Sequence, residues 1–138
     1  MSKKAEIQSM PEPTEDVEQI CLFRWAAYNK GRWPELDLMI HIPNGGKRSK
    51  AEAARFKEMG VRAGVSDVFL PVARGGCHGL WIEMKRLYSG RPTHDQLEWI
   101  EGMIKQGYEA TVCHGWEQAV KVIERYMGGT IEERTDNQ

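Results

Sequence analysis

Long hydrophobic runs are absent from this sequence of 138 residues, and none approaches the roughly 20 apolar residues that span a bilayer. Residues 1–8 have no apolar stretch after their lysines, so we expect no secretory signal. Cysteine is scarce as well. Cys21, Cys77 and Cys113 lie far apart without a CxxC pair, which argues against a disulfide framework and against a zinc ribbon. We therefore expect a protein of a reducing, cytoplasmic compartment.

The composition excludes a mainly disordered, collagen-like or coiled-coil chain, because 41% of the residues are hydrophobic and 28% are charged. The length corresponds to one domain with its own core. Residues 1–13 are polar and include Pro11 and Pro13, which predicts a flexible N-terminal arm. We expect a single folded domain over residues 14–129 and a disordered tail over residues 130–138.

The charge is unevenly distributed, although the formal net charge is only -1. Residues 47–91 contain ten basic and four acidic side chains, a net charge of +6. Contacts with phosphates need local positive charge rather than a basic protein overall, so this basic band is compatible with a nucleic-acid partner. A solvated face explains the same pattern, and charge alone favours that simpler explanation.

Hydrophobic periodicity and capping residues predict a mixed α/β domain, with a small central sheet and helices on its faces. Thr14, Ser49 and Thr93 are suited to cap helices at their N-termini. The predicted helices cover residues 14–29, 50–59, 94–106 and 116–127. The predicted strands cover residues 36–42 and 108–113, and residues 65–73 and 79–87 form a predicted hairpin.

Three charged side chains stand out within this predicted hairpin. Side chains alternate between the faces of a strand, so Glu83 and Lys85 share one face with Trp81. A turn near Gly75 would bring Asp67 close to Glu83, and a divalent cation would relieve the repulsion between the two carboxylates. A nearby lysine could activate a water molecule or stabilise developing negative charge. An ordinary ion pair on a solvent-facing strand explains the spacing equally well, so both interpretations stay open.

The first predicted helix offers a further carboxylate. Glu18 lies on the same helical stripe as Leu22 and Trp25, and Glu15 extends that stripe by one turn. Either carboxylate could point into a site. A frayed helix start facing water is the alternative, and it applies more strongly to Glu15 than to Glu18.

Four segments of the sequence resemble the virus-type replication-repair nuclease (VRR-NUC) domain, a branch of the PD-(D/E)xK nuclease superfamily with stand-alone phage and bacterial members. The segments are Glu18-Gln19 to Trp25, His41-Ile42-Pro43-Asn44-Gly45-Gly46, Gly64-Val65-Ser66-Asp67-Val68-Phe69-Leu70-Pro71 and Gly79-Leu80-Trp81-Ile82-Glu83-Met84-Lys85. Gln96, Trp99 and Gly107-Tyr108 continue the resemblance, which covers roughly residues 14–127. Ser66 replaces the proline of the "PD" pair, as is usual in this branch.

The resemblance implies a restriction-endonuclease-like core and a metal-dependent active site. Asp67, Glu83 and the main-chain carbonyl of Met84 would hold Mg²⁺ or Mn²⁺, with Glu18 as the first-helix carboxylate. Lys85 would be the catalytic lysine, and Gln96 would lie beside the site as the glutamine motif of the family. A capping role also explains Gln96, and the two roles are compatible.

The resemblance further implies a homodimeric endonuclease that hydrolyses phosphodiester bonds in branched DNA, in particular a Holliday-junction resolvase, with no membrane partner. The backbone of the DNA would contact the following residues: Asn44, Lys47, Arg48, Lys50, Arg62, Arg86 and Arg91. A flap or single-strand nuclease with the same site is one alternative. A DNA-binding module with a vestigial metal site is another, and a sequence-specific restriction enzyme is a third, although no base-reading module is evident.

Overall fold

The computed structural model describes residues 11–44 and 48–128. Most of the expected arm, the expected tail and the predicted DNA contact Lys47 therefore lie outside the described residues. No helix within these two ranges is both long and apolar enough to cross a membrane. The elements, in chain order, are α2 (Glu15–Tyr28), the 3-10 helix η1 (Pro34–Leu38), β1 (Ile40–His41), α3 (Lys50–Glu58), β2 (Val68–Leu70), β3 (Leu80–Lys85), α4 (His94–Lys105), β4 (Glu109–His114) and α5 (Trp116–Met127).

The strands form one mixed sheet of four strands in the order β1-β2-β3-β4. The β2–β3 pair is antiparallel, with Val68 opposite Ile82, which confirms the predicted hairpin. The β3–β4 pair is parallel, and α4 provides the crossover that parallel neighbours require. The predicted α/β class is thus confirmed, and β3 lies in the interior of the sheet with a partner on each side.

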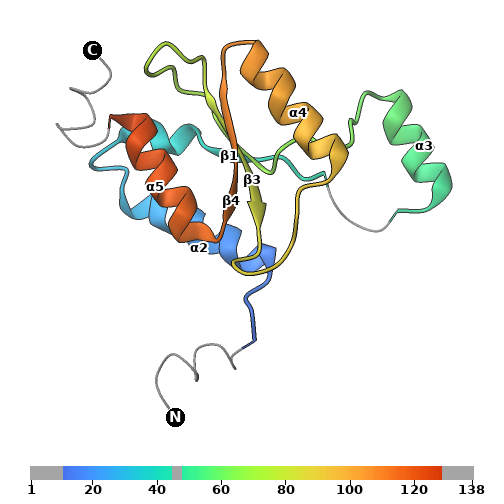
Figure 1. Ribbon diagram of the computed structural model, residues 1–138, viewed down its shortest axis with the longest axis horizontal. Helices are drawn as coiled ribbons and strands as arrows, with labels where there is room; N and C mark the ends of the chain where they lie inside the picture. The colour runs from blue at the N-terminus through green and yellow to red at the C-terminus, as the bar shows by residue number, and fades with distance from the viewer. Residues whose placement is uncertain (1–10, 45–47, 129–138) are drawn as a thin grey trace.

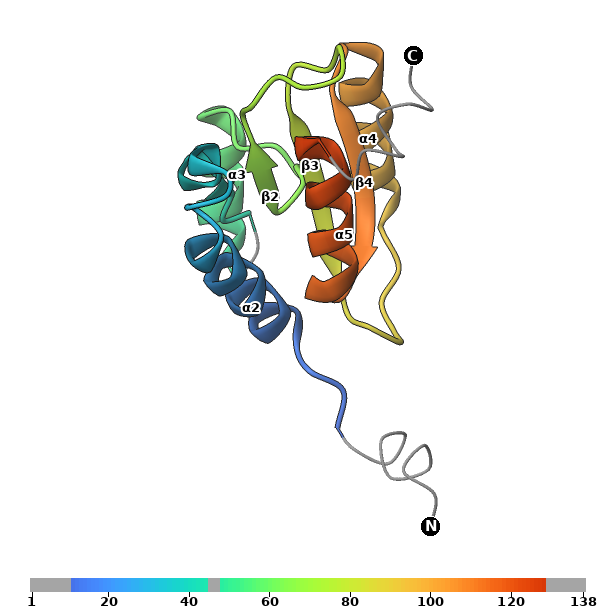
Figure 2. The same cartoon turned by 90° about the vertical axis from the view of Figure 1, so that its left-hand side faces the viewer.

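Helices cover both faces of the sheet, because β3 alternates two sets of apolar side chains. Leu80, Ile82 and Met84 join one core cluster with side chains of α2 and α5. Trp81 joins a second cluster with Ile100 of α4 on the other face. Figure 1 views the sheet nearly edge-on, with α2 and α5 on its left and α4 on its right. Figure 2 shows α5 in front of β3 and β4 after a quarter turn.

The helix starts follow the capping residues that the sequence indicates, with one exception. The hydroxyls of Thr14, Ser49 and Thr93 accept hydrogen bonds from main-chain N–H groups of α2, α3 and α4. The exception is α5, because Gly115 precedes it and has no side chain to offer. The first N–H groups of α5 therefore need a partner from elsewhere in the chain.

The predicted strand over residues 36–42 is wrong in its first half. Pro34 opens η1 instead, where its fixed φ and missing N–H suit the first turn of a helix. Of the predicted strand, the two residues of β1 form the strand that pairs with β2. The first hairpin strand is also shorter than predicted. It ends at Leu70 because Pro71 has no N–H to donate to a ladder.

Helix α3 lies apart from these layers. It buries none of its residues, and Figure 1 shows it at the right-hand edge of the molecule, away from α2 and α5. Its local sequence still makes a helix, because Ser49 caps it and alanines alternate with long charged side chains. The structure therefore presents α3 as an exposed arm between β1 and β2.

Gly64 fits a position that no other residue tolerates, three residues before Asp67. Its φ is +89°, and a Cβ there would overlap the main-chain carbonyl of Asp95 at the start of α4. We expect Gly64→Ala to lower the free energy of unfolding by at least about 2 kcal/mol, measured by denaturant titration. Gly60→Ala is the control, because its φ is +97° but the space around it is open, so about 1 kcal/mol is expected there. Equal losses in the two variants would contradict the overlap with Asp95.

Candidate active site

The hairpin brings Asp67 and Glu83 together at the start of β2. The register that pairs Val68 with Ile82 places Asp67 opposite Glu83 one step further along. The Asp67 carboxylate is held by the main-chain N–H of Met84, which donates to Oδ2 at 2.8 Å. Its main-chain oxygen accepts from the N–H of Ile42 at 2.8 Å. Asp67 is therefore fixed from both neighbouring strands.

Glu83 is a buried carboxylate with too few partners. The residue is 1% exposed, and its Oε2 atom has no hydrogen-bond partner. The pKa of Glu83 is raised to about 8, mainly by burial and next by the charge of Asp67, while Lys85 acts in the opposite direction. Burying a carboxyl group costs free energy unless it is paired. The unpaired oxygen next to a second carboxylate thus favours a site for a cation.

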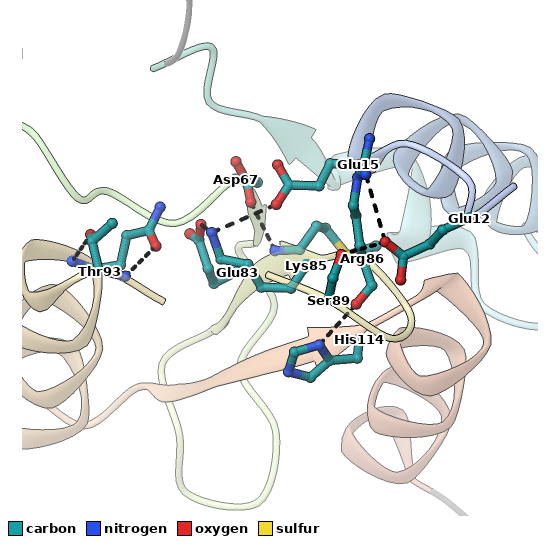
Figure 3. Close-up of polar contacts among 11 residues, drawn as sticks. Glu12, Glu15, Asp67, Glu83, Lys85, Arg86, Ser89, Thr93 and His114 are labelled. Carbon is teal, nitrogen blue, oxygen red and sulfur yellow. Dashed lines mark hydrogen bonds and ion pairs between the residues drawn. The ribbon is translucent and has the colours of Figure 1, made fainter. Parts of the chain in front are cut away.

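Lys85 provides a cation next to these carboxylates. Its side chain is 10% exposed, and its Nζ lies 3.5 Å from Oε1 of Glu83 and 3.6 Å from Oε1 of Glu15. Figure 3 shows Glu15, Asp67, Glu83 and Lys85 pointing toward one another at the same end of the sheet. Two of the three acids, Glu15 and Glu83, thus pair with one ammonium group that is largely removed from water.

The structure places the two candidate carboxylates of α2 differently from the sequence-based preference. Glu18 is 5% exposed, and its Oε2 accepts a hydrogen bond of 2.6 Å from the main-chain N–H of Trp116. It thereby supplies the partner that Gly115 cannot offer to the start of α5. Glu15, one turn earlier, is the α2 carboxylate that reaches Lys85. In this structure Glu15 is therefore paired with Lys85, whereas Glu18 is engaged with α5, and a role for Glu18 in metal binding stays a prediction.

A cleft of about 350 Å³ opens beside Asp67. It is lined by side chains of α2, including Glu15 and Gln19, and by His41 and Met84. The Nδ1 atom of His41 lies 2.8 Å from the main-chain oxygen of Asp67. A carbonyl oxygen only accepts, so Nδ1 carries the proton and Nε2 of neutral His41 is an acceptor. His41 belongs to one of the four segments that carry the family resemblance.

The main-chain carbonyl of Met84 is oriented toward the same place. Within a strand, the N–H and C=O of one residue point to the same side, and the Met84 N–H points to Asp67. The next carbonyl, of Lys85, points the opposite way and accepts from the N–H of Gly115 at 3.0 Å. The expected carbonyl ligand thus faces the carboxylates just before the start of β2.

Glu12 is a residue of this end of the molecule that the sequence did not single out. Its carboxylate accepts from the N–H of Tyr88 at 2.6 Å and from the hydroxyl of Ser89, and it lies 3.6 Å from Arg86. These hydrogen bonds lower the pKa of Glu12, with that to Ser89 as the main cause. The contacts span more than 70 residues of sequence, so no local signal could have revealed them.

Gln96 is engaged in the capping box of α4. Its side-chain oxygen accepts from the N–H of Thr93, and its own N–H donates to the Thr93 hydroxyl. The capping explanation is confirmed, and a role for Gln96 beside the charged cluster stays a prediction.

The residues predicted to contact DNA fall into two groups. Arg86 and Arg91 follow β3, where Arg86 pairs with Glu12 and Arg91 is exposed. Asn44, Arg48, Lys50 and Arg62 flank or begin α3, and the Asn44 side chain donates to the main-chain oxygen of Arg62 at 2.6 Å. Lys50 begins α3, and the Arg48 guanidinium lies over the ring of Phe56.

The donor set near Asp67 suits a small divalent cation. Within residues 11–44 and 48–128, no three Asp, Glu, His or Cys side chains form a complete metal cage. Two carboxylates, one of them with an unpaired oxygen, and a main-chain carbonyl form a partial oxygen shell. Mg²⁺ and Mn²⁺ accept oxygen ligands, and Mg²⁺ commonly retains several waters at such sites. These oxygen ligands therefore fit a bound Mg²⁺ or Mn²⁺ ion.

Comparisons with known proteins agree with this geometry. A family profile described as the VRR-NUC domain matches residues 13–117. A solved structure described as a "VRR_NUC domain protein" superposes with a TM-score of 0.74 at 36% sequence identity, covering 85% of this chain and 90% of the other. No curated protein matches the sequence.

The fold and the family match define a nuclease of the PD-(D/E)xK type, whose substrate is DNA. Nuclease domains of this type usually use divalent metal ions. More particularly, the chain belongs to the VRR-NUC domain family.

Proposed function

We propose that this protein is a divalent-metal-dependent endonuclease that hydrolyses phosphodiester bonds in branched DNA. The observation that carries the proposal is the buried Glu83, whose Oε2 has no partner while Asp67 lies opposite and Lys85 lies 3.5 Å from Oε1. Such a cluster is costly in an unliganded protein and is well suited to hold a cation and a phosphate.

Asp67, Glu83 and the Met84 carbonyl would hold Mg²⁺ or Mn²⁺. When bound, such an ion polarises a phosphate oxygen and lowers the pKa of a bound water. The main-chain N–H of Met84 keeps the Asp67 carboxylate in place. The Lys85 ammonium, held between Glu83 and Glu15, would orient the attacking water and stabilise the negative charge that develops on the phosphate.

We assign the α2 carboxylate of the reaction to Glu15 and a structural role to Glu18. Glu15→Ala is expected to slow metal-dependent cleavage about tenfold or more with little change in stability, because its side chain is 47% exposed. Glu18→Ala is expected to lower the free energy of unfolding by about 2 kcal/mol, because it leaves a helix N–H at Trp116 without its partner. Cleavage kinetics and denaturant titration of both variants test the assignment. The reverse pattern would return Glu18 to the reaction.

A four-way junction is the substrate that suits this proposal best. A homodimer with two sites related by a two-fold axis could make paired, symmetric cuts in such a junction, as a Holliday-junction resolvase does. The proposed backbone contacts carry no sequence information, which suits selection by DNA shape. We therefore expect a dimer at working concentration, which light scattering coupled to gel filtration measures directly.

The decisive experiment is cleavage of a labelled panel of linear duplex, 5′ flap, 3′ flap, splayed arm and four-way junction. It is run with Mg²⁺ and with Mn²⁺, on the wild type and on Glu83→Ala. Paired cuts in the junction, absent from the variant, are the expected result. Cleavage of flap or single-stranded DNA alone would support the proposed active site but reject the four-way junction as the substrate. Binding without cleavage of any DNA would favour a non-catalytic module.

A further inference from the structure

A second cavity lies between α3 and the segment that follows it, outside the charged cluster. It has a volume of about 590 Å³ and is lined by side chains that include Asn44, Arg48, Phe56, Lys57 and Arg62. We call it the α3 pocket. Volumes of several hundred Å³ are typical of sites for small organic groups.

The lining of the α3 pocket combines positive charge with flat and apolar surfaces. Arg48, Lys57 and Arg62 are cationic, and none of the described lining residues is acidic. The Arg48 guanidinium lies 4.4 Å from the centre of the half-buried Phe56 ring. Val61 adds aliphatic surface. Planar guanidinium and aromatic groups stack on nucleic-acid bases, and cations pair with the attached phosphates.

From these observations we propose that the α3 pocket holds one unpaired nucleotide of the DNA substrate, with its base stacked on the Arg48 guanidinium, which the Phe56 ring supports from its other face. A base inside a duplex has both faces covered by its neighbours, so only an unpaired base can stack here. A phosphate alone would use the three cations and leave the apolar surface of Phe56 and Val61 without a partner. The combination matches a whole nucleotide.

The α3 pocket is connected to the proposed reaction site by two short stretches of chain. Pro43 lines the cleft beside Asp67, and the next residue, Asn44, lines the α3 pocket. On the other side, Arg62 precedes Asp67 by five residues, which span at most about 18 Å. The Asn44 amide ties the two stretches together through the main-chain oxygen of Arg62. An unpaired nucleotide in the pocket would therefore lie only a few nucleotides from the phosphate that is cut.

This inference rests on the proposed function and makes it more specific. The substrate is DNA with an unpaired nucleotide next to the cleavage position, such as a branch point that has opened. The α3 arm would thus select branched DNA over a perfect duplex, since a duplex supplies no base for the pocket.

The test uses branched DNA that carries 2-aminopurine at each unpaired or branch-point position in turn, without divalent ions so that the DNA stays intact. Stacking quenches 2-aminopurine, so wild type is expected to quench one position near the cut. Phe56→Leu is expected to remove this quenching and to weaken binding of branched DNA at least fivefold, with a smaller effect on linear duplex. Phe56→Tyr is expected to restore both. Arg48→Lys keeps the positive charge but removes the planar guanidinium group, so it should weaken the quenching.

Tyr28→Leu is the matched control, because Tyr28 is 89% exposed on α2 and is absent from both lining sets. Unchanged quenching in Phe56→Leu would overturn the proposal. So would equal competition by a free mononucleotide, which would indicate a small-molecule site, or a changed elution volume of Phe56→Leu without DNA, which would indicate a protein contact. Cleavage of the same DNA by wild type with Mg²⁺ is scored separately. Absent cleavage with intact quenching would therefore reject the proposed function and retain the pocket.

Discussion

Replacing Lys85 with alanine is expected to slow DNA cleavage by about 10²–10³-fold while DNA binding persists. Its ammonium is the cation positioned between Glu83 and Glu15, and it is shielded from water, where its charge acts most strongly. Because the ammonium group is small and lies within the site, its removal should lower the cleavage rate far more than the affinity for DNA. Single-turnover cleavage at saturating enzyme measures the first effect, and fluorescence anisotropy measures the second.

Lys121→Ala is the matched control for this experiment, since Lys121 is exposed on α5. It removes the same charge from the protein without touching the cluster, so a rate close to that of wild type is expected. A cleavage rate of Lys85→Ala within threefold of that of wild type would contradict the assignment of Lys85 as the catalytic lysine. A loss of binding that matches the loss of rate would indicate a role in holding DNA.

Glu83→Gln is expected to stabilise the metal-free protein at alkaline pH while abolishing cleavage. Burial raises the pKa of Glu83 from 4.5 to about 8 in the folded state, so the folded protein binds a proton that the unfolded chain has released. Stability of wild type therefore falls as pH rises through the window from about 4.5 to about 8. A neutral amide avoids this loss, and the gain over wild type should reach about 2–4 kcal/mol above pH 8.

Urea titrations at several pH values, without metal, measure this difference. Glu98→Gln, on the exposed surface of α4, is the control and should follow wild type. Adding Mg²⁺ or Mn²⁺ should stabilise wild type more than Glu83→Gln, because the variant lacks a ligand. Parallel pH curves for wild type and Glu83→Gln would contradict the buried, raised-pKa carboxyl. Equal stabilisation by metal would place the ion elsewhere.

Local sequence patterns predicted well the hairpin that holds the charged cluster. The alternation of β3 and the turn that follows β2 are local features, and they sufficed to bring Asp67 opposite Glu83 beside Lys85. The helices that cover the sheet were also visible from capping residues and periodicity, as for Thr93 at the start of α4. Each of these features is decided by residues within one or two turns of one another.

The remaining features depend on contacts between distant parts of the chain. Periodicity placed Glu15 and Glu18 on one stripe, but it could not show that the start of α5 lacks a cap and recruits Glu18. Nor could it show that Glu12 would hold the residues after β3. The short apolar run before His41 was predicted as a strand, but its first half forms η1. Pro34 favours a helical turn, the apolar residues that follow favour a strand, and packing decides between the two.

The hydrogen bond between Glu18 and Trp116 also has a consequence for the order of folding. It joins residues 98 positions apart, whereas the hydrogen bond from Met84 to Asp67 closes a loop of only 17. Closing the longer loop costs more chain entropy, so the hairpin can form first and the α2–α5 contact last. Trp116 fluorescence during refolding should therefore report the final step. Asp67 and Glu83 would then be neighbours before α2 is fixed against α5. The charged cluster of the hairpin would form early in folding, and the contact between the two helices would form late.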